Sequence, residues 1–591
     1  MLPEVRHDDY IMLARINSFF KTHRLELLLL LAYTSLAMIF WFPLSIHLRT
    51  WLFDPNFGDS AFNMWILGWG SHALLHAPWR FFEAPMFYPY HHVLAWGDNL
   101  FAVTLVTLPL VPIIGLLAVY NLVLVGSSIL CGFTLYVLVN YLTKNKPAAF
   151  LAGSIWMLSY ARIVQAYIQI LPLWWLPLIF LFAEKLRRGQ YKKIPWFFPL
   201  VIFLQLTTGI YVAVYTVISF AIYAVVLGLF GLVNKSTWKK FATSWLIAGA
   251  CAVPIYAPSI LLNIRHPTVR SLNDQVALQW ADLNPLHAPG ALWHKLLLHL
   301  GLTPSPQQAQ FSLGILLSLL VTIGVAYGIW RIWRAKKIDK GHALPLAFLV
   351  LGSFALIAAL GPNITLFQGH HVRNWLFILP YTLVPGFKTM RLTLRWQFIA
   401  LMSLAIFASF LVARLLRRWP IWLQVGLVSL AVIGIVIEQA PWGGLGKPAP
   451  PLASAPVYAW LSQQPGQFAV AELPIYAGVY YGPNDAIEGR RLYFQTLSGW
   501  HPRASGAFSP YIPGSYPVRA GIIDSLGDNN QAIAYLRQYN IKYVLVLPND
   551  YVTLGWGATG GADEEKKLNS LPYLKKAFTS PNGVAYQVLP K

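Results

Sequence analysis

Twelve long apolar segments constrain the fold of this chain more than any other feature of its sequence. Several approach the roughly 20 consecutive apolar residues that a helix needs to cross a bilayer. Only 11% of the 591 residues are charged, while 57% are hydrophobic, and no soluble globular protein of this size has such a composition. We therefore predict a mainly α-helical protein, a polytopic bundle of about 11 to 13 transmembrane spans. The segments are 25–47, 100–117, 119–142, 147–162, 170–184, 195–208, 211–232, 241–262, 311–332, 343–361, 396–413 and 420–440.

The charge distribution predicts the orientation of these spans. The formal net charge is +22, which would suggest a nucleic-acid partner in a soluble protein. In a membrane protein it indicates the excess of Lys and Arg on the cytoplasmic side, so we expect no nucleic acid. We therefore place the N-terminal segment 1–24 in the cytoplasm and the protein in the plasma membrane. The basic clusters lie within 6–24, 185–193, 235–240, 331–340 and 414–418.

This orientation divides the chain into a membrane domain, 25–440, with three extracytoplasmic loops at 48–99, 263–310 and 362–395. One conflict arises. Four apolar segments separate the extracytoplasmic first loop from the cytoplasmic cluster at 185–193, but a chain that passes from one side of the membrane to the other must cross it an odd number of times. The segment 100–117 contains Pro109 and Pro112. We expect it to be a re-entrant or interfacial piece buried in protein.

The remainder of the chain, 441–591, changes character and begins with a linker rich in glycine and proline. Helix patterns at 454–464 and 530–539 alternate with apolar strand patterns at 468–474 and 541–547. About 150 residues suffice for an independent core. We expect a soluble extracytoplasmic α/β domain.

Two aspartates of the first loop are the candidate catalytic residues. Asp59 lies soon after the first span and Asp98 closes the loop before the chain returns to the membrane. A carboxylate at the mouth of a membrane bundle is well placed to act as a base on a substrate presented at the lipid surface. The alternative is structural, because Gly-Asp-Ser is also a good turn and helix-cap sequence.

Between these aspartates, residues 60–75 have apolar residues at helical spacing. We interpret them as an amphipathic helix lying in the membrane interface, with Trp65, Trp69 and Trp79 as aromatic anchors in contact with membrane lipids. His91 and His92 follow. They could bind phosphate or a metal, or simply form hydrogen bonds in the interface.

The other outer loops carry further candidate substrate-binding residues. Asp282 lies in a polar, proline-rich stretch that could cover a site, and His370 and His371 lie in the third loop. Arg391 and Arg395 are four residues apart and would share one face of a helix. They could clamp an anionic head group, since guanidinium matches phosphate oxygens, or they could be a solvated pair.

Several functional classes lack their motifs. The sequence has no P-loop, no convincing dinucleotide fingerprint, and neither a His-Glu-x-x-His nor a Cys-x-x-Cys signature. ATP-driven transport, dehydrogenase and zinc-protease functions therefore have no support. The spans contain few charged residues in mid-segment, whereas ion-coupled transporters usually contain them.

Short motifs give the chain a family resemblance. They are Gly58-Asp59 after the first span, Phe87-Tyr88-Pro89 leading to Gly97-Asp98-Asn99, the run 385–395, and the tail motifs at 471–474, 500–502 and 543–546. With these features the chain resembles the GT-C-type polytopic membrane glycosyltransferases, particularly the branch near YfhO-like and family-39-like proteins. The resemblance implies a GT-C-like bundle.

The resemblance also implies an activity: transfer of a sugar from a polyprenyl-phosphate donor to a glycan, lipid or protein acceptor at the outer face. Asp59 would be the base, and Asp98 would position the acceptor or bind a divalent cation, Mg²⁺ or Mn²⁺. The family commonly has an adjacent acidic pair, whereas the aspartates here are separated, so Asp54 could be the base instead. Arg391, Arg395 or His370 could stabilise the departing phosphate.

Two other functions remain open from the sequence. One is a non-catalytic role as a lipid or glycan flippase or as a cell-envelope assembly protein, in which Asp59 would be dispensable. The other is a glycan ligase or polymerase, which would rely more on the outer arginines. The tail could bind carbohydrate through Trp500 and His501, or it could be a structural cap over the outer loops.

Overall fold

The computed structural model describes most of the chain. Asp282, His370 and Arg391 lie outside the described residues, and of His371 only the backbone is described. The described residues are 24–54, 57–267, 271–272, 313–336, 339–365, 371–384, 387–390, 392–441, 444–475, 483–506, 512–527, 530–555 and 559–590.

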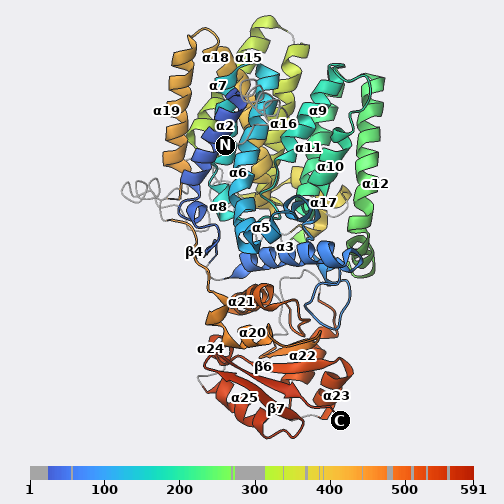
Figure 1. Cartoon of the computed structure of the whole chain (residues 1–591). Coiled ribbons are helices and arrows are strands. Elements are labelled where there is room, and N and C mark those ends of the chain that lie inside the picture. The colour runs from blue at the N-terminus through green and yellow to red at the C-terminus, as the bar shows by residue number, and fades with distance from the viewer. Residues whose placement is uncertain are drawn as a thin grey trace, which may run out of the picture.

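Helices run side by side along eleven of the twelve apolar segments and form a bundle (Figure 1). Within the described ranges, eight helices are long and apolar enough to cross a membrane. Three others, α2, α9 and α10, follow apolar segments but have only 17, 13 and 10 residues. The eleven are α2 (Arg24–Phe40), α6 (Leu116–Thr143), α7 (Lys146–Met157), α9 (Trp175–Arg187), α10 (Phe197–Leu206), α11 (Ile210–Leu229), α12 (Lys235–Arg265), α15 (Ile315–Ala335), α16 (Ala343–Ala359), α18 (Gln397–Leu416) and α19 (Ile421–Gln439).

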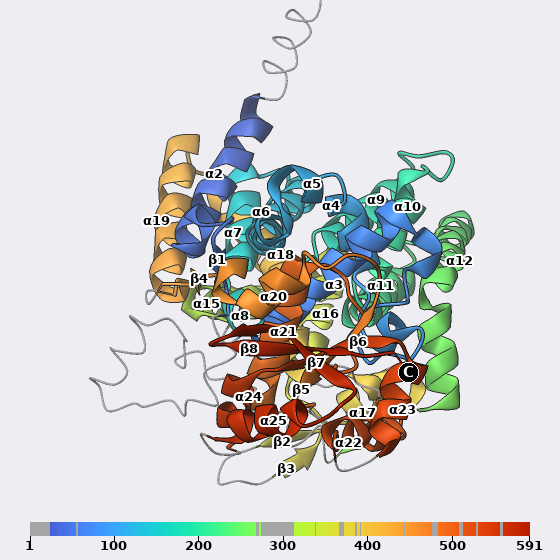
Figure 2. The ribbon, with the colours of Figure 1, turned by 60° about the horizontal axis from the view of Figure 1, so that its bottom comes forward.

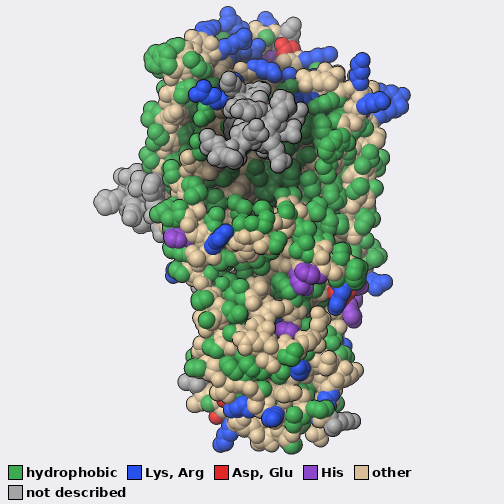
Figure 3. All heavy atoms as spheres, viewed as in Figure 1, with side chains coloured by type: hydrophobic (Ala, Val, Ile, Leu, Met, Phe, Trp, Pro, Cys, Tyr) green, Lys and Arg blue, Asp and Glu red, His purple; other side chains and the backbone are tan. Residues whose placement is uncertain are grey.

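The twelfth segment, 100–117, does not form a span. It forms two short helices, α4 (Phe101–Thr107) and α5 (Val111–Ile114), which are too short to cross a bilayer. Gly115, with φ +86°, ends the second one. Lys and Arg side chains of the described residues gather at one end of the bundle, above a hydrophobic band (Figure 3).

Helix α3 (Gly58–His76) lies across the opposite end of the bundle, between the spans and the C-terminal sheet (Figure 1). The prediction that Trp65 and Trp69 anchor it in lipid is wrong. Both rings are buried in protein, and the Trp65 indole N–H donates to Gln495 Oε1 at 2.8 Å. Trp79 is 82% exposed.

The C-terminal sheet has the strand order β5-β6-β8-β7 (Figure 2). β5 (Ala469–Leu473) and β6 (Ile541–Val546) are parallel, whereas β8 (Gly583–Val588) runs antiparallel to both β6 and β7 (Leu574–Ser580). Both predicted strands are confirmed within two residues. The helices of this part are α20 (Pro456–Leu461), α21 (Pro483–Ser498), α22 (Tyr516–Asp524), α23 (Asn530–Gln538), α24 (Pro548–Thr553) and α25 (Gly560–Asn569).

A domain boundary near residue 441 remains our proposal. It is supported by the end of α19, the last helix of the bundle, at Gln439.

Two short strand pairings connect other segments of the described structure. β1 (Trp51–Leu52) pairs with β4 (Lys447–Pro448), so the chain leaving α19 is tied to the first loop. β2 (Asn363–Thr365) pairs with β3 (His371–Arg373), ahead of α17 (Trp375–Leu383).

Buried ion pairs hold the C-terminal part together. Arg491 bridges Glu488 at 2.8 Å and Asp550 at 2.9 Å, while Arg503 bridges Glu488 at 2.9 Å and also pairs with Glu472. All five side chains are at most 1% exposed. Removing one partner would leave a buried charge uncompensated, which costs about 3–5 kcal/mol.

The same ion-pair cluster anchors the C-terminal part to the first outer loop. The backbone N–H of Tyr88 donates to the carbonyl of Arg503 at 2.8 Å, and the N–H of Arg503 donates to Pro85 at 3.2 Å. The Phe87 N–H donates to Ser505 at 3.0 Å. The sheet is therefore docked on the first loop beside α3.

Candidate functional site

Asp54 and Asp59 lie together at the start of α3. Asp59 is in the first turn of the helix, where the partial positive charge of the N-terminus stabilises a carboxylate. An ideal Cβ on Gly58 would lie 3.0 Å from Asp54 Oδ2, so the Asp54 carboxylate lies directly against this turn. Both aspartates are partly exposed.

Tyr120 lies near these aspartates, and Tyr167 lies near Tyr120. The Tyr120 hydroxyl, buried at the outer end of α6, is within electrostatic reach of Asp54, Asp59 and Tyr167. Tyr167 follows the short helix α8 (Ala161–Val164). The aspartates therefore face the bundle.

Asp98 lies at the start of α11. Its Oδ1 accepts a hydrogen bond from the backbone N–H of Ile210 at 2.7 Å and lies 3.5 Å from an ideal Cβ on Gly209. The carboxylate faces the protein interior. Burial raises the pKa of Asp98, while the Ile210 N–H and the positive charge of Arg395 act in the opposite direction. Asp98 therefore caps the start of α11, as the structural alternative for this residue predicts.

Arg395 is buried, with 5% of its surface exposed, so the solvated alternative for this residue is wrong. Its Nε donates to Gln165 Oε1 at 3.2 Å. Its guanidinium lies over the rings of Tyr211, at 4.6 Å, and Tyr167, at 5.7 Å. Such aromatic contacts stabilise a desolvated cation by about 2 kcal/mol.

The expectation that Arg391 and Arg395 share one helical face falls partly outside the described residues, because Arg391 is not described. Leu392 has extended backbone angles, and the 3₁₀ helix that leads into α18 spans only Thr393–Trp396. In the described residues from 392 onward, helical structure therefore begins at Thr393.

Together these residues form one polar strip, which we define as Asp54, Asp59, Tyr120, Tyr167, Gln165, Arg395, Tyr211 and Asp98. Tyr167 joins its two halves, because it neighbours both Tyr120 and Arg395. Sequence reasoning predicted the three aspartates and Arg395 but missed Gln165 and the tyrosines. Tyrosine in apolar surroundings is ordinary in a membrane chain, so its spacing carried no signal.

The two histidines of the first loop have a simpler arrangement. His91 Nδ1 lies 3.0 Å from one oxygen of Glu83, and His92 Nδ1 lies 2.9 Å from the other. Both histidines are exposed. These contacts correspond to the hydrogen-bonding alternative, and binding of phosphate or a metal by the two histidines stays a prediction.

The side chains around Asp98 do not fit a divalent cation, because its neighbours are an amide N–H and a guanidinium. In the part of the chain that the structure describes, no group of three or more His, Cys, Asp or Glu residues is placed to hold a metal ion. Mg²⁺ can bind through one or two carboxylates together with substrate phosphate. A divalent cation at Asp59 or Asp98, the two candidate metal ligands, therefore stays a prediction.

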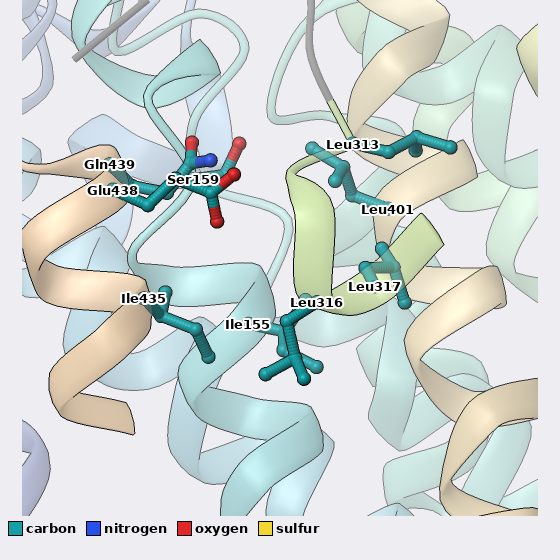
Figure 4. Close-up of a pocket in the computed structure, with 9 residues that line it drawn as sticks. All are labelled: Ile155, Ser159, Leu313, Leu316, Leu317, Leu401, Ile435, Glu438 and Gln439. Carbon is teal, nitrogen blue, oxygen red and sulfur yellow. The ribbon is translucent and has the colours of Figure 1, made fainter. Parts of the chain in front are cut away.

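A second polar cluster lies at the junction of α7, α15, α18 and α19. Figure 4 shows Ser159, Glu438 and Gln439 together, across from leucines. The cavity is only about 10 Å³. Glu438 Oε1 accepts the Ile315 N–H at 2.7 Å, so the carboxylate caps the start of α15. We assign this cluster to helix anchoring.

Comparison with known proteins defines the fold. No protein-family model matches the sequence, and no curated protein is significantly similar to it. Among solved structures, the mycobacterial arabinofuranosyltransferase AftD superposes with a TM-score of 0.52 and 13% identity, over 96% of this chain and 40% of AftD. A mutant form of AftD gives 0.53 at 12% identity, over 96% of this chain and 42% of that one.

This chain has the GT-C-type fold. It spans about two fifths of the length of AftD. The oligosaccharyltransferase of Archaeoglobus fulgidus also matches, with a TM-score of 0.49 and 13% identity over 97% of this chain and 75% of that one. The closer relation to YfhO-like and family-39-like proteins stays a prediction.

Proposed function

We propose that this protein is an integral membrane glycosyltransferase. It would move a sugar from a polyprenyl-phosphate donor to an acceptor at the outer face of the plasma membrane. The single observation that carries the proposal is the polar strip, which joins a partly exposed carboxylate, Asp59, to a buried cation, Arg395, at one end of a membrane bundle. The GT-C-type fold supports it.

Asp59 is the proposed base. It would accept the proton of the acceptor hydroxyl while that oxygen forms a bond to the anomeric carbon of the donor. The bond between the anomeric carbon and the phosphate oxygen breaks, and its electron pair stays on the phosphate. Asp59 suits this role better than Asp98, because it lies beside Asp54 and Tyr120, whereas the Asp98 carboxylate is engaged by the Ile210 N–H and faces Arg395.

Arg395 and Asp98 have supporting roles. The guanidinium of Arg395 would offset the negative charge that develops on the leaving polyprenyl phosphate. Asp98 is a positioning residue, because its carboxylate caps α11 and faces Arg395. A buried cation with a nearby carboxylate costs less than an isolated one.

The orientation of the protein follows from the positive-inside rule. The end of the bundle rich in Lys and Arg lies in the cytoplasm together with the N-terminus, and the polar strip and the C-terminal sheet lie outside. The lipid tail of the donor would remain in the bilayer beside the spans, where membrane lipids already surround the protein.

The decisive experiment measures sugar transfer in proteoliposomes from a panel of polyprenyl-phosphate sugars. We expect Asp59→Asn to lower the rate by about 10² to 10⁴, the usual contribution of a general base. Asp54→Asn is the matched control, since it makes the same charge change in the same loop, and we expect it to retain at least a tenth of the activity.

Two results would contradict this assignment. Loss of transfer in Asp54→Asn with normal transfer in Asp59→Asn would move the base to Asp54. If folded wild-type protein transferred no sugar from any donor but moved a fluorescent polyprenyl phosphate between leaflets, the alternative function of a flippase would replace the enzyme.

A further inference from the structure

A groove of about 250 Å³ opens between the first outer loop and the C-terminal part. The last turns of α3 and the segment 77–91 form one wall. Residues 467, 500 and 502 of the C-terminal part contribute the other. The groove is separate from the polar strip, because α3 carries Asp59 in its first turn and the groove residues in its last turns.

Aromatic rings line the floor of this groove. The ring of Trp500 lies 5.7 Å from Trp69 and 5.8 Å from His72, and His76 stacks on His72 at 4.6 Å. An ideal Cβ on Gly68 would lie 3.0 Å from Trp500, so the absence of a side chain there allows the indole to lie against α3.

Polar groups surround the aromatic floor. Arg80 and Gln467 are exposed at the rim, and Glu83 lies 3.0 Å from His91. Burial and the neighbouring His76 lower the pKa of His72, so this imidazole is neutral near pH 7 and can both donate and accept a hydrogen bond.

Aromatic rings beside neutral donors and acceptors match the chemistry of sugars. The C–H faces of a sugar ring are apolar and pack on flat aromatic surfaces, while its hydroxyls need planar polar partners at the edges. A largely apolar concave site with a few convergent polar groups is also the usual form of a ligand pocket. The groove therefore fits a carbohydrate better than a lipid tail or an inorganic anion.

We propose that this groove binds an oligosaccharide segment of the acceptor, an inference that rests on the proposed function. At 1.5 Å per residue, Asp59 and His76 are about 25 Å apart along α3. A single sugar cannot reach both ends of this helix. The acceptor is therefore a chain of several sugars, held by the groove while its reacting end lies at Asp59.

Binding can be measured without transfer. We propose calorimetry on the purified full chain with maltohexaose, cellohexaose, mannohexaose and arabinohexaose, each compared with its monosaccharide. We expect at least one hexasaccharide to bind ten or more times more tightly than its monosaccharide, and Trp500→Ala to weaken that binding at least tenfold. Trp79→Ala is the matched control, because Trp79 is 82% exposed and is not among the residues of segment 77–91 that line the groove.

A double variant, Arg80→Ala with Gln467→Ala, tests the groove without disturbing the fold. Both side chains are exposed, so their removal leaves the core intact. We expect it to weaken hexasaccharide binding at least threefold. The proposal is overturned if no hexasaccharide binds more tightly than its monosaccharide, or if the double variant and folded Trp500→Ala both bind as wild type does.

The same variants separate this proposal from the proposed function. Asp59→Asn should still bind the hexasaccharide at least ten times more tightly than the monosaccharide, so groove binding is tested separately from the role of Asp59. In transfer assays, Trp500→Ala should raise the KM for the long acceptor and leave kcat nearly unchanged. A drop in kcat with an unchanged KM would contradict a binding role for the groove.

Discussion

At the scale of single residues, the pairing of Asp98 with the buried Arg395 is the arrangement with the most consequences. The two residues come from distant segments, one before α4 and one before α18, and the positive charge of Arg395 acts to lower the pKa of Asp98. Burial of a cation costs free energy unless an anion and hydrogen bonds compensate it. Gln165 and the rings of Tyr211 and Tyr167 complete that compensation.

This pair predicts a pH effect. Arg395 lowers the pKa of Asp98, so Arg395→Gln should raise that pKa further above its ordinary value. The proton would then be retained to a higher pH, and the acid limb of the pH–rate profile for sugar transfer should move upward. Arg395→Lys keeps the charge and should leave the limb in place. An acid limb that does not move in Arg395→Gln would show that the two residues are not coupled.

At the scale of elements, the contact between α21 and α3 positions the candidate base. An ideal Cβ on Gly489 of α21 would lie only 2.7 Å from the carbonyl oxygen of Phe57, which immediately precedes α3. Phe57 also packs its ring on Tyr493, with centroids 5.4 Å apart. The C-terminal part thus contacts the backbone that carries Asp59.

Gly489→Ala should therefore disturb the site from outside it. The added methyl must displace the Phe57 backbone, at a cost of about 1–3 kcal/mol. We expect a lower thermal stability and at least a tenfold loss of transfer. Gly521→Ala in α22 is the matched control, because nothing lies within 4 Å of its Cβ position, and it should be neutral or stabilising by up to about 1 kcal/mol. Equal effects of the two changes would refute a positioning role for this contact.

At the scale of the whole molecule, the predicted topology depends on whether segment 100–117 crosses the membrane. The failure of 100–117 to form a span removes the conflict in parity and separates the basic end of the bundle from the end that carries α3 and the sheet (Figures 1 and 3). Proline and glycine in that segment interrupt the helix, so its apolar length is divided into two pieces.

This topology predicts the accessibility of introduced cysteines. In a variant whose two native cysteines are replaced, Ser454→Cys should react with a membrane-impermeant maleimide on intact cells, because it is exposed on the side of the sheet. Lys192→Cys, also exposed but at the basic end, should react only after the cells are opened. Reaction of Lys192→Cys in intact cells would contradict the orientation.

The sequence alone determined the features that depend on local composition. The length of apolar runs predicts spans, the distribution of Lys and Arg predicts which ends share a side, and alternating helix and strand patterns predict the C-terminal sheet, because each of these properties is set within about 20 residues. For the same reason, the position of the first-loop aspartates next to apolar spans is enough to select them as candidates.

Only the tertiary structure decided what covers each residue. Trp65 and Trp69 have the pattern of lipid anchors, but the C-terminal part packs over them and removes them from the membrane. Arg395 has the pattern of a surface cation, yet Asp98 and two tyrosines enclose it. These outcomes depend on contacts between segments that lie far apart in the chain, and no local periodicity records which distant segment will pack against a given face.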